Sequence, residues 1–165
     1  MDKCSGYFLK VPYVTWDTKG LGIYVGFSNN VLEHNVIDGC RAGGIVVQFS
    51  NPTNTIVRYN VIKNGGIHSP WPPPSGFTIQ GGTGINVGPE TQGTLVYNNI
   101  FSHIRSDPRG GYHDSDCILI YDNATATTIY NNTCYDSDNG IVFGLGGFGG
   151  PYNADVRNNI FSSVL

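Results

Sequence analysis

Four aspartates in the second half of the chain stand where their carboxylates could meet. Each of two consecutive apolar runs is preceded by one pair, Asp114 with Asp116 and then Asp136 with Asp138. Clustered carboxylates bind hard cations such as Ca²⁺, and a pair of them can also act as general acid and base. The alternative is that they are ordinary turn residues, placed wherever a strand must bend.

Four of the five candidate histidines and arginines stand in the same part of the chain, and the fifth, His68, stands earlier. Imidazole titrates near neutral pH, so His68, His103 and His113 could transfer protons or bind a metal, although exposed histidines often have no function. Arg105 and Arg109 could hold the carboxylate of an acidic substrate, because a planar guanidinium pairs with it through two hydrogen bonds. They could equally tie this segment to the aspartates.

Aromatic side chains offer flat apolar surfaces on which a sugar ring can lie. Trp71 stands in a proline-rich stretch that stiffens the chain, and Tyr112 lies close to His113 in the titratable segment. Tyrosines one or two residues before a recurring asparagine could stack on sugars as well, but are more often expected to cover a strand face: Tyr59, Tyr97 and Tyr130.

The composition indicates one all-β domain spanning residues 1–165. Isoleucine, valine, asparagine and 23 glycines dominate, which is typical of strands and turns. A net charge of -3 with only 13% charged residues gives no basic surface for nucleic acid. No apolar run approaches the roughly 18 residues that cross a membrane, so membrane insertion is not expected.

The four cysteines show no C-x-x-C spacing, which argues against a zinc site or a thioredoxin-like redox motif. Buried free thiols are the first expectation, and a disulfide stays open as the alternative. The residues concerned are Cys4, Cys40, Cys117 and Cys134.

Two interleaved series of short segments repeat along the chain. The first series aligns on one asparagine, at Asn35, Asn60, Asn99, Asn132 and Asn159. The second is a β-branched run that usually opens with Gly-Ile, at residues 22–25, 44–47, 84–87, 117–120 and 140–143. Such internal repetition indicates a solenoid of stacked supersecondary units.

The spacing of the repeats predicts the kind of solenoid. The asparagines advance by 25, 39, 33 and 27 residues, so a basal period in the twenties is lengthened by insertions. A short period of this kind suits coils of two or three parallel strands that stack at about 4.8 Å. An inward asparagine at one bend can donate to one neighbouring coil and accept from the other, forming a ladder. A β-sandwich or barrel is the alternative, but it does not predict the recurring asparagine.

Insertions in a solenoid form loops on one face, which is often the binding face. We expect insertions at about residues 66–83, 102–116 and 144–153. The first two should leave adjacent coils at the same corner and lie side by side. The third is glycine-rich but lacks the Lys-Ser/Thr of a nucleotide-binding loop, so it is interpreted as a turn insertion.

The asparagine series and the Gly-Ile runs resemble those of the right-handed parallel β-helix proteins, which include pectate lyases, polygalacturonases and phage tailspikes. The resemblance covers about residues 20–165. It implies a right-handed, single-stranded parallel β-helix of about five to six coils with an internal asparagine ladder. The last coil shows no capping pattern, so we expect a fragment of a longer protein, self-association through the open end, or both.

The resemblance also implies a carbohydrate-active protein that acts on or binds an acidic polysaccharide, as a lyase or hydrolase, outside the cell or at its surface. No signal peptide is apparent at the first residues, and the N-T-D, G-H-G and R-I-K strings of polygalacturonases are absent. The alternatives are a non-catalytic glycan-binding module and a structural or adhesive segment of a surface protein.

The candidate residues divide into three roles under this interpretation. The catalytic candidates are Asp114, Asp116, His113, Arg105 and Arg109. The substrate-binding candidates are Trp71, His68, Tyr112 and His103. The ligands of a Ca²⁺ ion, the one cofactor expected, would be Asp114, Asp116, Asp136 and Asp138.

Overall fold

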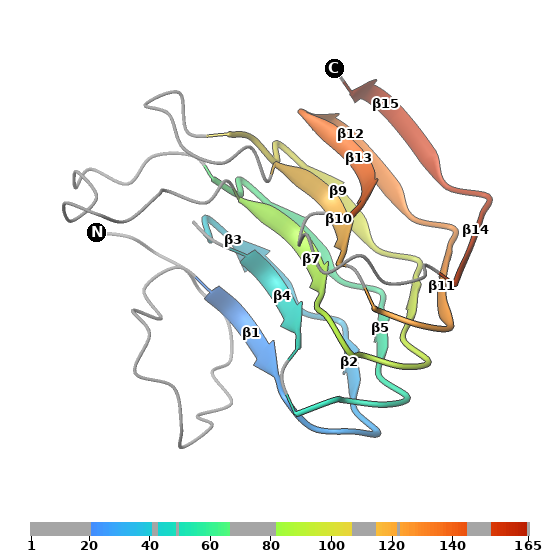
Figure 1. The fold of residues 1–165 in the computed structure, drawn as a ribbon. Helices are drawn as coiled ribbons and strands as arrows, with labels where there is room; N and C mark the ends of the chain where they lie inside the picture. Colours follow the sequence, from blue (N-terminus) through green and yellow to red (C-terminus); the bar gives the residue numbers. More distant parts are fainter. Residues whose placement is uncertain are drawn as a thin grey trace, which may run out of the picture.

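The computed structural model describes residues 21–40, 43–48, 50–66, 82–106, 115–121, 123–144 and 153–164. These residues form fifteen strands in three parallel sheets of five (Figure 1). Sheet A contains β1 (Leu21–Val25), β4 (Gly43–Val47), β7 (Thr83–Val87), β10 (Asp116–Ile120) and β13 (Asn139–Phe143). Sheet B contains β2 (Val31–Glu33), β5 (Ile56–Arg58), β8 (Leu95–Tyr97), β11 (Thr127–Tyr130) and β14 (Ala154–Arg157). Sheet C contains β3 (Val36–Asp38), β6 (Val61–Lys63), β9 (Ile100–Ser102), β12 (Thr133–Ser137) and β15 (Ile160–Val164).

The chain passes through sheets A, B and C in turn and then begins the next coil. Five coils therefore stack along one axis, and each strand pairs with the strand one coil before and one coil after it. In Figure 1 the colours run in sequence order across each sheet, for example from β1 to β13 in sheet A and from β3 to β15 in sheet C. The predicted all-β solenoid of parallel strands is confirmed, and the sandwich and barrel alternatives are excluded.

Equal positions in successive coils lie directly above one another, so the interior consists of columns of similar side chains. The isoleucines of the Gly-Ile runs form one such column in sheet A, where Ile23, Ile45, Ile85, Ile118 and Ile141 are in register. Its three middle members are fully buried. Each such isoleucine stabilises the fold by about 2 kcal/mol through removal of its side chain from water.

The bend between sheets B and C takes two residues in every coil. The first adopts the left-handed region with φ between 54° and 58°, at His34, Tyr59, Asn98, Asn131 and Asn158. Asparagine tolerates this region better than most residues, which explains its presence at three of the five positions. The second residue is the repeated asparagine predicted from the sequence.

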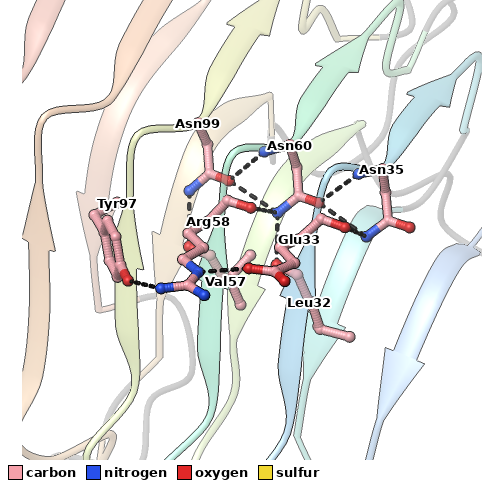
Figure 2. Close-up of polar contacts among 8 residues, drawn as sticks. All are labelled: Leu32, Glu33, Asn35, Val57, Arg58, Asn60, Tyr97 and Asn99. Carbon is pink, nitrogen blue, oxygen red and sulfur yellow. Dashed lines mark hydrogen bonds and ion pairs between the residues drawn. The ribbon is translucent and has the colours of Figure 1, made fainter.

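The repeated asparagines are hydrogen-bonded from coil to coil (Figure 2). The backbone N–H and Nδ2 of Asn60 donate to Oδ1 of Asn99 at 3.0 and 2.9 Å, and Asn99 donates in the same way to Asn132. Nδ2 of Asn60 also donates to the carbonyl of Leu32 at 2.9 Å. Each amide therefore satisfies buried backbone groups of two coils, which would otherwise be costly to bury.

Glycines in sheet A face large side chains in sheet C across the interior. A Cβ on Gly84 would lie 2.5 Å from the ring of Phe101, and one on Gly44 would lie 2.6 Å from Ile62. A Cβ on Gly140 would lie 2.6 Å from Phe161. Glycine opens the Gly-Ile runs because the opposite residue occupies the space of its side chain.

Coil 4 fills the same space with a disulfide. Cys117 takes the glycine position of β10, Cys134 takes the large-residue position of β12, and the two are bonded. Cys40 is disulfide-bonded as well. The expectation of buried free thiols is therefore wrong for these three cysteines, while Cys4 lies outside the described residues. The spacing of 17 residues between Cys117 and Cys134 matches no recognised cysteine motif. The pairing depends instead on which residues of sheets A and C face each other within one coil.

The first prediction concerns this exchange of a disulfide for a glycine and an aromatic ring. Cys134→Phe alone should destabilise the protein, because the new ring meets the side chain of Cys117. Adding Cys117→Gly recreates the pairs of coils 3 and 5 and should restore the fold. The double variant should still be about 3 kcal/mol less stable than the oxidised wild type, which gains the loop-closure contribution of a disulfide. Urea unfolding followed by circular dichroism measures both, and equal destabilisation of the two variants would contradict the pairing.

The second prediction concerns the asparagine ladder. Asn99→Ala removes the acceptor of the buried Asn60 N–H and should lower the free energy of unfolding by about 3 kcal/mol. Asn35→Ala is the matched control, because within the described residues no earlier coil donates to its Oδ1, and should cost about 1 kcal/mol. Equal losses in urea unfolding would show that the ladder bonds do not carry this energy.

Candidate functional site

The structure describes five of the eleven candidate site residues. The described ones are His103, Arg105, Asp116, Asp136 and Asp138. Those outside the described residues are His68, Trp71, Arg109, Tyr112, His113 and Asp114. Of the three predicted insertions, residues 67–81, 107–114 and 145–152 also lie outside them, so what the structure shows is where these segments join the coils.

The first two segments join adjacent coils at one corner, between sheets C and A. The N–H of Gly66 donates to the carbonyl of Cys40, and the N–H of Arg105 donates to the carbonyl of Gly65 at 3.0 Å. Gly66 has φ +77°, and a Cβ on Gly82 would overlap the backbone nitrogen of Gly66. The chain therefore leaves coil 2 after Gly66 and enters coil 3 at Gly82, and the close backbone contact between these two residues is one that only glycine permits.

Four charged or titratable side chains meet beside this corner, which we call the corner cluster: His103, Arg105, Asp136 and Asp138. One guanidinium nitrogen of Arg105 lies 2.8 Å from Asp138, and another forms an ion pair with Asp136. Nε2 of His103 lies 3.3 Å from the second oxygen of Asp136. Arg105 therefore lies between two of the four carboxylates that were predicted to hold Ca²⁺, and links the start of the 107–114 segment to them.

Asp138 joins both ends of the 107–114 segment. Its second oxygen accepts hydrogen bonds from the N–H and hydroxyl of Ser106 at 2.7 and 2.8 Å, and the side chain of Ser115 also donates to it. Burial disfavours ionisation of this carboxyl, but the bonds from Arg105, Ser106 and Ser115 outweigh it and hold the pKa of Asp138 below its usual range. Its hydrogen bond to Asp138 raises the pKa of Arg105, against the effect of burial and with the help of both carboxylates. A permanently charged Arg105 has no lone pair with which to act as a base.

Asp116 lies apart from the corner cluster because it is fully buried in β10. Among the described residues no group of three histidine, cysteine, aspartate or glutamate side chains is placed to hold a metal ion.

Tyr135 was not among the predicted site residues; it lies in β12 and is 49% exposed. Its ring meets that of His103 edge to face, with centroids 6.3 Å apart. Lys63 stands in register with it two coils earlier and lies 3.2 Å from Asp38. The signal was available, because Tyr135 follows the inward Cys134 and must therefore point outward.

The three repeated tyrosines lie on the outer side of sheet B and its bend, away from the corner cluster. The rings of Tyr97 and Tyr130 stack with centroids 4.7 Å apart and planes 7° apart. Nη1 of Arg58 donates to the hydroxyl of Tyr97 at 2.8 Å, while its Nε pairs with Glu33 (Figure 2). The facing sides of Tyr97 and Tyr130 cover each other, so they offer ring edges and hydroxyls rather than two free faces.

Comparison with known proteins does not assign this chain to a family. No family model, curated protein or solved structure matches it. Within the described ranges, no helix is long and apolar enough to cross a membrane. The structure defines a β-helix-like solenoid with a charged corner.

The third prediction follows from the depressed pKa of Asp138. The unfolded carboxyl titrates at about pH 3.9, above the folded one, so its bonds stabilise the protein at neutral pH. That contribution is lost as the pH falls through the folded-state pKa. Asp138→Asn should therefore lower the free energy of unfolding by about 2 kcal/mol at neutral pH, and the difference should narrow in acid.

Urea unfolding at neutral pH and near pH 3 tests this expectation. Glu90→Gln serves as the control because its side chain is exposed, and it should change the stability by less than about 0.5 kcal/mol. A loss in Asp138→Asn that is the same at both pH values would show that the charge of Asp138 is not what joins the segment ends.

Proposed function

We propose that this protein is a right-handed, pectate lyase-like β-helix that binds an acidic polysaccharide at the corner between sheets C and A. One observation carries the proposal. Two insertions leave adjacent coils beside the corner cluster, in a chain whose charged residues are otherwise few and scattered. Ligand sites of solenoids commonly lie where insertions share one face.

The exposed groups of this corner suit a sugar chain. Tyr135 offers a half-exposed ring for the apolar face of a pyranose, and Asp136 and His103 offer hydrogen-bonding groups for its hydroxyls. Lys63 lies on the same outer column as Tyr135 and brings positive charge for a uronate carboxylate. We therefore place Lys63 and Tyr135 in the site with His103, Arg105 and Asp136.

Binding without turnover is the form of the proposal that the described residues support. General acid catalysis needs a group whose pKa lies near the working pH. The lowered pKa of Asp138 makes it a poor general acid, and the raised pKa of Arg105 makes it a poor general base. The catalytic and Ca²⁺-binding hypotheses now depend on Asp114, His113 and Arg109, which lie outside the described residues, together with Asp116 and Asp136.

The fourth prediction compares two tyrosines of similar exposure at different corners. Tyr135→Ala should weaken binding of an oligogalacturonide at least about fivefold, because it removes the stacking surface. Tyr59→Ala, whose ring is 45% exposed and stacks on His34 instead, should leave the affinity unchanged. Isothermal titration calorimetry with the oligogalacturonide and a neutral oligosaccharide of equal length, each with and without Ca²⁺, measures this. The proposal fails if neither sugar binds, or if the two variants lose affinity equally.

A further inference from the structure

The outer face of sheet C carries two columns of side chains that run along the axis of the solenoid. In β3, β6, β9 and β12 the second residue is buried, and the residues before and after it point outward. The column nearer the bend to sheet B, which we call the aliphatic column, holds Val36 and Ile100 at 59% and 50% exposure. Its members are Val36, Val61, Ile100, Thr133 and Ile160.

The column nearer the corner between sheets C and A, which we call the polar column, differs in character. Its members are Asp38, Lys63, Ser102, Tyr135 and Ser162. Lys63, Ser102 and Tyr135 occupy the same position in coils 2, 3 and 4. His103 and Asp136 directly follow Ser102 and Tyr135 in the sequence. The exposed groups of the proposed polysaccharide site therefore form a row along the axis, and not a row along one strand.

The spacing of this row suits successive sugars of one chain. Equal positions in neighbouring coils are about 4.8 Å apart, so Lys63 and Tyr135 are separated by about 10 Å along the axis. One pyranose ring adds a length close to one coil spacing to an extended polysaccharide. Three consecutive sugars can therefore meet Lys63, Ser102 and Tyr135 in turn.

The two columns also match the two kinds of surface that a uronan presents. Carboxylates and hydroxyls lie around the edge of a uronic acid ring, and C–H groups make up much of its faces. A chain that lies along the axis can place C–H groups over the aliphatic column and polar groups at Lys63 and Ser102. A chain that crossed the sheet along one strand would bring polar groups over the aliphatic column, where nothing compensates for their desolvation.

We propose that the acidic polysaccharide lies along the solenoid axis over the outer face of sheet C, with three consecutive sugars on coils 2, 3 and 4. One uronate carboxylate pairs with Lys63, the next sugar forms hydrogen bonds with Ser102 and His103, and the third stacks on Tyr135. Lys63 lies 3.2 Å from Asp38, but both side chains are 40% exposed, so its ammonium can also donate to a ligand. This inference rests on the proposed function and adds to it the path of the chain and the minimum length of the ligand.

The fifth prediction concerns that length. Oligogalacturonides of one to six residues are titrated into the protein by isothermal titration calorimetry at one salt concentration. The trimer should bind at least about tenfold more tightly than the dimer, because only the trimer reaches Lys63 and Tyr135 together. From trimer to hexamer the affinity should change by less than about threefold. Lys63→Ala should lower the affinity for the trimer to that for the dimer.

Two threonines of coil 4 provide a matched test of the path. Thr133 lies in the aliphatic column and Thr128 at the equivalent outer position of sheet B, and both are half-buried. Thr133→Glu places a negative charge beneath the path and should weaken binding of the trimer at least about tenfold. Thr128→Glu should leave the affinity within about twofold of the wild type. Circular dichroism checks that both variants are folded.

The outcomes separate this inference from the proposed function. Binding that requires Tyr135 but has the same strength from monomer to hexamer would overturn the inference and leave the proposed function standing. Equal losses in Thr133→Glu and Thr128→Glu would do the same. If no oligogalacturonide binds, both the proposed function and the inference are overturned.

Discussion

The alignment of equal positions in successive coils is the constraint on which the rest of this structure depends. Parallel pairing places each side chain directly against its counterparts one coil away. A buried position must therefore hold a residue that packs on its own kind. Isoleucine does so through shape, and asparagine does so because its amide carries both a donor and an acceptor. A shift of one residue would turn the isoleucines outward, so the columns also fix the register.

The number of residues in a coil can vary only at positions that lie outside the stacked columns of side chains. Residues 67–81 are inserted between Gly66 and Gly82, which contact each other, and residues 107–114 are inserted between Ser106 and Ser115, which both hydrogen-bond to Asp138. The coils above and below keep their pairing across both insertions. Long insertions add little loop-closure cost once their ends are held together. The corner between sheets C and A is therefore where this solenoid can acquire polar groups without disturbing its interior.

Repetition made the fold predictable, and departures from repetition hid the rest. The recurring asparagine and the Gly-Ile runs were sufficient to predict parallel coils, because each appears five times in one order. The disulfide was not predicted because Cys117 stands where a glycine opens the other runs. Its pairing with a residue of sheet C becomes apparent only once Gly84 and Phe101 are known to face each other. Asp116 was grouped with the surface aspartates, but it is fully buried in β10. The partners of Arg105 depend on the path of the corner, which no periodicity encodes.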